Sequence, residues 1–190
     1  MRVIAGTHRG RRLQGPQGFV LRPTSDRVRE ALFSILAHRL LNCRFLDLYA
    51  GTGAVGIEAV SRGAKHVICV ESAHQAKALV QLNIAHCGVG DRMTIVHQTV
   101  QRFLSQADHW DEPYDIIFAD PPYESVPEFV SLVGAVDTGR LFAVDAWLII
   151  EHALKTSLPA SVAGMTFQRC YRYGDTALSI FSRLPQNTSL

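Results

Sequence analysis

The chain has 190 residues, of which 47% are hydrophobic and 19% are charged, as in an ordinary globular protein. It contains neither an apolar run long enough to span a membrane nor a signal peptide, so we expect a cytoplasmic protein that does not act on membranes. The four cysteines are far apart and form no Cys-x-x-Cys pair, which predicts buried free thiols and no metal site.

The formal net charge of +2 is unevenly distributed. Residues 1–29 carry seven arginines and one acidic residue, a net charge of +6, whereas the rest of the chain carries −4. A basic segment attached to a mildly acidic body favours a polyanionic partner that binds from one side. The alternative is a solvated basic terminus without a partner.

The amino-terminal residues alternate briefly in polarity over 2–6 and 10–13, on either side of a tip at His8 and Arg9. This pattern predicts a short solvated hairpin that carries little of the packing. We therefore divide the chain into a basic arm, residues 1–22, and one folded domain, residues 23–190.

A helix is expected to begin after the arm, with Thr24 or Ser25 as its N-cap and Asp26 in its first turn. An apolar stripe at helical spacing runs from residue 28 to residue 36 and is expected to face the core. The functional candidates here are instead the basic residues Arg22, Arg27 and Arg29.

A glycine-rich turn follows the first apolar strand, which we expect at residues 44–49, and precedes a helix at 53–62. Gly51, Gly53 and Gly56 form a Gly-x-Gly-x-x-Gly pattern, which allows a sharp turn and a close approach of the backbone to a ligand. Glu71 lies twenty residues beyond Gly51, at the end of the next expected strand. This arrangement is typical of a nucleotide-type cofactor site.

Two cofactor classes fit the turn, and Asp47 helps to separate them. A dinucleotide brings a pyrophosphate, which a neighbouring carboxylate repels. S-adenosylmethionine brings an ammonium and a sulfonium, which the carboxylate attracts. We therefore favour S-adenosylmethionine over a nicotinamide dinucleotide, although Asp47 could also serve as a cap on the following turn.

From residue 44 strands and helices alternate and then give way to a closing hairpin, which predicts an α/β fold with a mostly parallel sheet and one antiparallel strand. The expected strands are 44–49, 65–71, 93–96, 114–119, 146–150, 167–173 and 177–181. The further helices are 73–87, which we expect Gly88 to end, 100–105 and one that starts near Pro127.

The tetrad Asp120-Pro121-Pro122-Tyr123 directly follows the strand at 114–119. Its two prolines lack N–H donors, so carbonyls and the Asp120 carboxylate remain as acceptors. Such acceptors suit the exocyclic amine of a nucleobase, and the Tyr123 ring offers a surface on which the base can stack. A simple strand-ending turn is the structural alternative.

Taken together, Asp-x-x-x-Gly-x-Gly and Asp-Pro-Pro-Tyr resemble the motifs of class I S-adenosylmethionine-dependent amino-methyltransferases. The stretch Arg22 to Phe33 and the start Ile4-Ala5-Gly6 with Arg9-Gly10-Arg11 resemble one bacterial branch, the 16S ribosomal RNA guanine-N2 methyltransferases of the RsmD type. The resemblance covers almost the whole chain. It implies a Rossmann-like methyltransferase domain at 23–190 with a seven-stranded sheet.

The resemblance also implies roles for particular residues. Asp47, Gly51 and Gly53 would hold the methionine end of S-adenosylmethionine, Glu71 would bind the ribose hydroxyls, and Asp120 to Tyr123 would bind the target amine. Relatives often place Asp or Asn after the third strand to contact adenine. This chain has His97-Gln98-Thr99 there, so Gln98 or the Thr99 backbone is the expected substitute.

We therefore expect methyl transfer to guanine N2 in small-subunit ribosomal RNA, either naked or in an assembly intermediate, without a metal. The arginines Arg9, Arg11, Arg12, Arg22 and Arg27 would grip phosphates, which positions the RNA without reading its sequence. Two alternatives are a DNA adenine or cytosine amino-methyltransferase and a non-catalytic RNA-binding ribosome-assembly factor. The chain lacks an obvious domain for reading DNA sequence, and a pure binder would need neither Asp47 nor Asp120.

Overall fold

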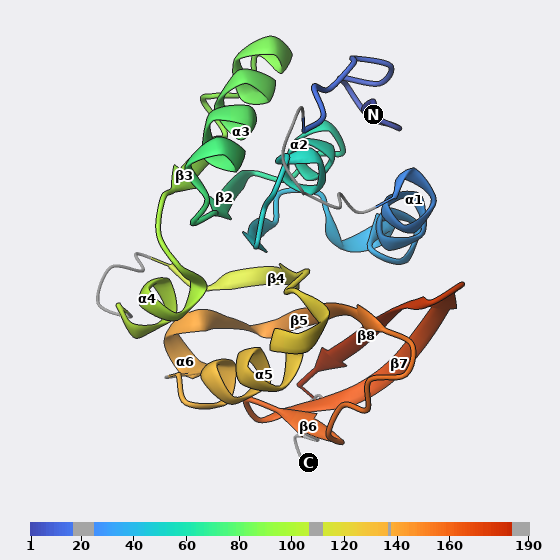
Figure 1. Ribbon diagram of the computed structural model, residues 1–190, viewed down its shortest axis with the longest axis vertical. Helices are drawn as coiled ribbons and strands as arrows, with labels where there is room; N and C mark the ends of the chain where they lie inside the picture. Colours follow the sequence, from blue (N-terminus) through green and yellow to red (C-terminus); the bar gives the residue numbers. More distant parts are fainter. Residues whose placement is uncertain (17–24, 107–111, 137, 184–190) are drawn as a thin grey trace, which may run out of the picture. The chain divides into compact units, whose positions relative to one another are not determined.

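A computed structural model describes residues 1–16, 25–106, 112–136 and 138–183. The chain divides into two compact units, Met1–Phe103 and Leu104–Leu190, and both are built from strands and helices (Figure 1). The division into a 1–22 arm and a 23–190 domain stays a prediction, but residues 1–16 belong to the first unit. Arg22 lies outside the described residues.

The first unit contains a parallel sheet with the strand order β3-β2-β1. The strand β1 is buried from its second residue onward, as expected for a parallel strand covered on both faces. Helices α2 and α3 lie on the same side of this sheet (Figure 1). The elements are α1 (Asp26–Ile35), η1 (Ala37–Arg39), β1 (Arg44–Leu48), α2 (Ala54–Ser61), β2 (His66–Val70), α3 (His74–Cys87) and β3 (Met93–Val96), and α4 (Val100–Ser105) spans the division between the units.

The ends of the helices in the first unit follow the local sequence. The Ser25 hydroxyl accepts a hydrogen bond from Val28 N–H at 3.2 Å, so Ser25, one of the two predicted candidates, is the N-cap of α1. Gly88 ends α3 in the left-handed conformation, with φ +64°, which glycine adopts without steric cost. Both predictions are confirmed.

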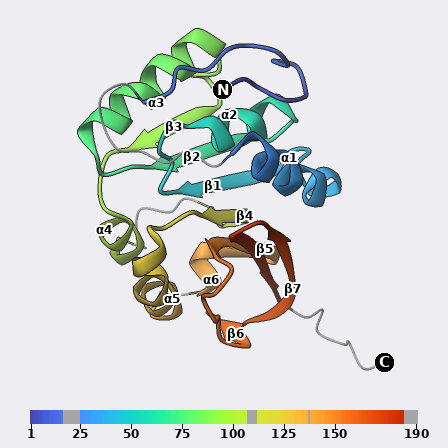
Figure 2. The same ribbon diagram turned by 45° about the vertical axis from the view of Figure 1, so that its right-hand side comes forward.

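The amino-terminal segment differs from the expected hairpin in how it packs. Arg2 and Arg12 form an isolated antiparallel bridge, and the side chains of Val3 and Leu13 are buried. The segment lies alongside α2 and α3 (Figure 2) and bonds to both helices. The hairpin itself is confirmed, because Val3 N–H donates to the Arg11 carbonyl and Gly10 N–H donates to the Val3 carbonyl. The prediction that it is solvated and carries little of the packing is wrong.

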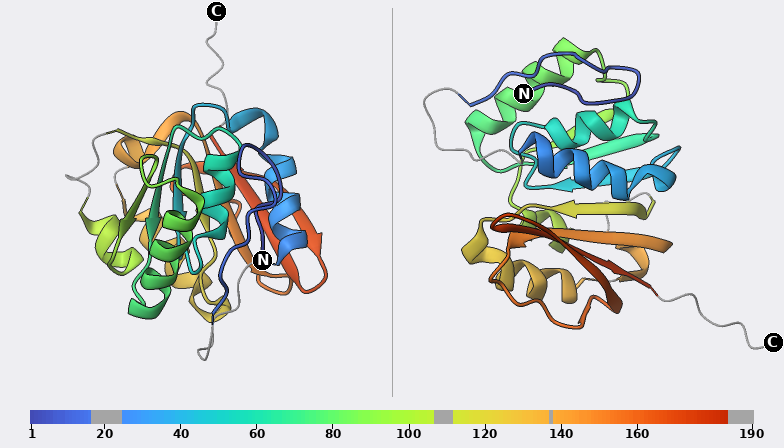
Figure 3. Two further views of the ribbon diagram at one scale, coloured as in Figure 1. Left: turned by 90° about the horizontal axis from the view of Figure 1, so that it is seen from above. Right: turned by 90° about the vertical axis from the view of Figure 1, so that its right-hand side faces the viewer.

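The second unit contains a mixed sheet with the strand order β4-β5-β8-β7-β6. The strands β4 and β5 are parallel, whereas β8 runs antiparallel to both β5 and β7, and β6 runs antiparallel to β7. The long β7–β8 hairpin is visible in both views of Figure 3. The elements are β4 (Tyr114–Ala119), η3 (Tyr123–Ser125), α5 (Val126–Gly134), α6 (Thr138–Leu141), β5 (Phe142–Ala153), β6 (Ser161–Val162), β7 (Met165–Tyr173) and β8 (Thr176–Ser182).

The seven strands expected from the sequence are all present in the described residues, and the two-residue β6 is an eighth. The strand β5 is much longer than the predicted 146–150, because it begins at Phe142 and continues to Ala153, with Glu151 and His152 paired with β8. In the part of the chain that the structure describes, no helix combines the length and the apolar character needed to cross a membrane.

Candidate active site

Asp47 lies near the end of β1, and only 1% of its surface is exposed. Its Oδ2 accepts a hydrogen bond from the backbone N–H of Gly56, 3.1 Å away in the first turn of α2. The residue before this helix is Gly53, which has no side chain to supply a cap. Asp47 therefore caps α2 from the neighbouring strand and brings a negative charge to the amino end of the helix.

The loop between β1 and α2 has an unusual backbone. Gly51 and Gly53 have φ of +56° and +73°, and a Cβ at Gly53 would lie 2.8 Å from Cγ1 of Val80. Glycine is therefore required at 53 by both conformation and space. Tyr49 also has a positive φ, +66°, which costs an L-residue on the order of 1–3 kcal/mol and which the sequence did not signal.

Glu71 follows β2 and bonds directly to this loop. Its Oε2 accepts a hydrogen bond from Gly51 N–H and its Oε1 accepts one from Ala73 N–H, both at 2.8 Å. The side chain is 9% exposed. The structure thus brings together Gly51 and Glu71, which the sequence had linked only by their spacing.

The two carboxylates make this end of the first unit electronegative. Cys69 lies on β2 with a buried thiol, and burial raises the pKa of this thiol well above its ordinary value. The negative charges of Asp47 and Glu71 raise the same pKa further. The thiol therefore stays protonated, and the charges that a ligand meets at the loop are those of the carboxylates.

Asn83 of α3 bonds to the loop, and the sequence analysis did not identify it as a site residue. It is fully buried on α3, and its Nδ2 donates to the Thr52 carbonyl at 2.9 Å and to the Gln14 carbonyl at 3.1 Å. Its Oδ1 accepts from Gln14 N–H at 2.8 Å. Asn83 thus ties the glycine loop to the amino-terminal segment. The available signal was a polar residue within an otherwise apolar stripe of α3.

The two predicted adenine contacts lie between β3 and α4. Thr99 is exposed, and its hydroxyl accepts a hydrogen bond from Arg102 N–H at 3.2 Å, as an N-cap of α4 would. Gln98 is partly exposed, and its backbone N–H donates to the Val96 carbonyl. Their role in binding adenine stays a prediction.

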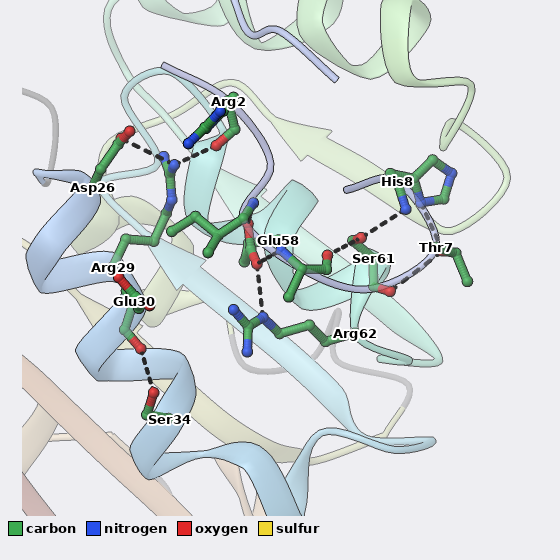
Figure 4. Close-up of polar contacts among 12 residues, drawn as sticks. Arg2, Thr7, His8, Asp26, Arg29, Glu30, Ser34, Glu58, Ser61 and Arg62 are labelled. Carbon is green, nitrogen blue, oxygen red and sulfur yellow. Dashed lines mark hydrogen bonds and ion pairs between the residues drawn. The ribbon is translucent and has the colours of Figure 1, made fainter. Parts of the chain in front are cut away.

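The amino-terminal segment is held by a buried carboxylate, Glu58 of α2 (Figure 4). This carboxylate accepts hydrogen bonds from Ile4 N–H at 2.7 Å, from Ala5 N–H at 2.9 Å and from Arg62 Nε at 2.7 Å. Ser61 adds a bond from its hydroxyl to the Ala5 carbonyl at 2.6 Å. Residues 4–8 of the segment are therefore bonded to the helix that begins at the glycine loop.

The predicted phosphate contacts occupy different environments. Arg9, Arg12 and Arg27 are exposed. Arg11 is exposed as well, but its guanidinium donates to the carbonyl of Cys87, the last residue of α3, and so also caps that helix. The pKa of the neighbouring His8 is lowered, mainly by burial and further by the positive charges of Arg11 and Arg92.

Arg29 was named as a functional candidate at the start of the first helix, but it is fully buried and is therefore not available to a partner. Its guanidinium donates to the Arg2 carbonyl and to Asp26 Oδ1 (Figure 4). Burial lowers the pKa of Arg29, and the charge of Asp26 opposes this shift. Arg29 therefore joins α1 to the amino-terminal segment.

The second unit carries the Asp-Pro-Pro-Tyr tetrad directly after β4. Pro121 is buried, Pro122 is exposed, and Asp120 and Tyr123 are half-buried. Tyr123 begins the short helix η3, and its hydroxyl lies 2.9 Å from Oγ1 of Thr176, the first residue of β8. The first unit thus gathers four predicted cofactor residues at one loop, namely Asp47, Gly51, Gly53 and Glu71. The second unit holds the predicted amine-binding residues at the end of one strand.

Comparison with known proteins identifies the family. Residues 1–182 match the family described as conserved hypothetical protein 95. Ribosomal RNA small subunit methyltransferase D of Escherichia coli (strain K12) is 34% identical over 191 residues, covering 100% of this chain and 93% of the relative. The chain belongs to the family of these small subunit methyltransferases.

Comparison with solved structures tests the predicted fold. The yhhF protein from Escherichia coli matches with a TM-score of 0.82 and 32% identity, covering 98% of this chain and 99% of that chain. A hypothetical protein of Thermus thermophilus matches with a TM-score of 0.80 and 30% identity, over 95% of this chain and 98% of that chain. The predicted class I methyltransferase fold is confirmed.

Proposed function

We propose that this chain transfers a methyl group from S-adenosylmethionine to the exocyclic N2 amine of a guanine in small-subunit (16S) ribosomal RNA. The observation that carries the proposal is the pair of buried carboxylates, Asp47 and Glu71, bonded to the glycine loop of a chain in this family. The name of the Escherichia coli relative supports ribosomal RNA as the substrate. The chemistry of the tetrad supports an exocyclic amine as the target, and the resemblance supports guanine N2 as that amine.

The bonding of the loop supports S-adenosylmethionine over a dinucleotide. A pyrophosphate binds to free N–H groups at the start of a helix. Here Gly56 N–H already donates to Asp47, and Gly51 N–H donates to Glu71. A phosphate would lose these donors and meet two negative charges, whereas the ammonium and the sulfonium of S-adenosylmethionine are attracted by them.

The tetrad supplies hydrogen-bond acceptors and a negative charge that would activate the target amine. The lone pair of a guanine N2 amine is delocalised into the ring, so the amine is a poor nucleophile. Asp120 accepts a hydrogen bond from the amine, which favours a pyramidal nitrogen, and its charge stabilises the positive charge that develops as the nitrogen–methyl bond forms. The carbonyls beside Pro121 and Pro122 accept the second N–H. The amine loses one proton during the transfer, and the cofactor leaves as a neutral thioether.

The exposed arginines are proposed to bind RNA phosphates. Arg9 and Arg12 lie on the amino-terminal segment and Arg27 on α1, and all three belong to the first unit. The same segment is tied to the glycine loop through Asn83. The target base must leave its stack to reach Asp120, which costs on the order of a few kcal/mol, and phosphate contacts offset part of this cost.

Methyl transfer to defined substrates tests the proposal. The purified protein is incubated with methyl-labelled S-adenosylmethionine and with unmodified 16S RNA, small-subunit particles or DNA, and the Asp120→Ala variant serves as the control. We expect label in RNA or particles and almost none with the variant. Label in DNA alone would favour the DNA methyltransferase alternative. Tight RNA binding without any label would favour the assembly factor.

A further inference from the structure

The hydroxyl of Tyr123 has a defined partner in the second unit. Its Oη lies 2.9 Å from Oγ1 of Thr176, a hydrogen-bonding distance between two neutral hydroxyls. Thr176 is only 7% exposed, so the partner is an enclosed group and not a mobile surface side chain. The two residues are 53 positions apart in the sequence, and no motif links them.

The backbone of Thr176 is held within the sheet. As the first residue of β8 it pairs with Ala153 of β5 and with Tyr173 of β7. The turn before it contains Gly174, with φ +62°, and the carbonyl of Asp175 accepts a hydrogen bond from Leu154 N–H at 2.8 Å. The strands β5, β8 and β7, which lie side by side in Figure 1, therefore hold the backbone of Thr176 in place from both sides.

The backbone of Tyr123 is fixed as well. The two prolines before it restrict the chain, and Pro121 is buried. The carbonyl of Pro122 accepts a hydrogen bond from Ser125 N–H at 2.8 Å, which closes the first turn of η3. With its backbone held at one end and its hydroxyl at the other, the ring of Tyr123 cannot turn freely about its side-chain bonds.

We propose that Thr176 is a positioning residue that holds the Tyr123 ring in the orientation in which the target base stacks on it. This inference rests on the proposed function. Through the bond to its phenol hydroxyl, Thr176 fixes the orientation of the Tyr123 ring, whose face the base would contact. A ring oriented in advance spares the flipped base the cost of ordering its own stacking partner.

A double-mutant cycle tests the pair, with Thr176→Val, Tyr123→Phe and the double variant. Loss of a hydrogen bond between neutral groups predicts that each single variant lowers kcat/KM for RNA about threefold to tenfold, with unchanged affinity for S-adenosylmethionine. The double variant should be no worse than either single variant, because both remove the same bond. Thr176→Ser keeps the hydroxyl and should therefore retain the wild-type kcat/KM. The control variant Thr166→Val, on β7 of the same hairpin, should leave kcat/KM unchanged.

The outcomes separate this inference from the proposed function. Additive losses in the double variant, or full activity of Thr176→Val, would overturn the positioning role. A wild-type protein that methylates no RNA would instead overturn the proposed function. In that case the hydrogen bond between Tyr123 and Thr176 can still be tested, because NMR of protein labelled at the tyrosine Cζ does not require methyl transfer. We expect Thr176→Val to shift the Tyr123 resonance and Thr176→Ser to preserve it, and an unmoved resonance in Thr176→Val would refute the pairing.

Discussion

The buried carboxylate of Glu58 offers the sharpest test of how the amino-terminal segment is held. Glu58→Gln keeps the size of the side chain but removes its charge and replaces one acceptor oxygen by an NH₂ donor. In the wild type the two oxygens accept from Ile4 N–H, Ala5 N–H and Arg62 Nε, at 2.7 to 2.9 Å. In the variant at least one of these donors faces another donor.

The expected cost follows from these contacts. A hydrogen bond to a charged group contributes about 1.5–3 kcal/mol, and a buried donor left without a partner costs about 1–3 kcal/mol. Because Glu58 is fully buried, water cannot replace the lost acceptor. Taking one lost charged bond and partial rearrangement of the others, we expect a loss of about 3 kcal/mol in the free energy of unfolding. For a chain of this length, that lowers Tm by roughly 6–12 °C.

Thermal melting of Glu58→Gln against the wild type measures this loss, and limited proteolysis reports whether the amino-terminal segment is released. Glu30→Gln is the matched control, because Glu30 is exposed on α1 and carries the same charge change. We expect the control to melt within about 2 °C of the wild type, as surface substitutions usually do. A Glu58→Gln variant that melts equally close to the wild type, with the segment still protected, would refute the anchoring role.

Four further predictions concern the site and the fold. Asp47→Ala should severely weaken S-adenosylmethionine binding in calorimetry while NADH fails to bind to either protein, and undiminished affinity would remove the cofactor assignment. Asp120→Ala should keep cofactor affinity within a few fold yet reduce methyl transfer by roughly two to four orders of magnitude, so near-normal turnover would contradict its role. Arg9→Ala with Arg12→Ala should weaken RNA binding and reduce the slope of log affinity against log salt by about 0.7–0.9 for each lost phosphate contact, whereas parallel slopes with equal affinities would mean a solvated terminus. Burial lowers the pKa of His152 below its ordinary value of 6.5, so the unfolded chain binds a proton at this histidine more readily than the folded chain does. The free energy of unfolding should therefore fall as the pH drops below 6.5, and a pKa of His152 at or above 6.5 in an NMR titration would contradict this.

The sequence was informative where function depends on local spacing. The glycine loop, the capping of α1 by Ser25 and the end of α3 at Gly88 are set by residues within a turn of each other, and all three were predicted correctly. The length of β5 was not, because Glu151 and His152 look like the polar end of a strand. In the structure both are buried and paired with β8.

Contacts between segments far apart in the chain could not be predicted from the sequence. Glu58 bonds to residues more than fifty positions away, and Asn83 and Thr176 have partners at similar separations. Arg29 shows how a count of charges misleads, since its charge was added to the basic segment although its side chain is buried. One signal for this was available: Arg29 lies four residues before Phe33, so it shares the apolar face of α1.

Whether the protein methylates guanine N2 is decided by the identity of the labelled nucleoside. Unmodified 16S RNA or small-subunit particles are treated with the protein and methyl-labelled S-adenosylmethionine, digested to nucleosides and separated by chromatography with mass detection. We predict that the label appears as N2-methylguanosine and disappears with Asp120→Ala. Label on adenine, on cytosine or on another position of guanine would contradict this claim.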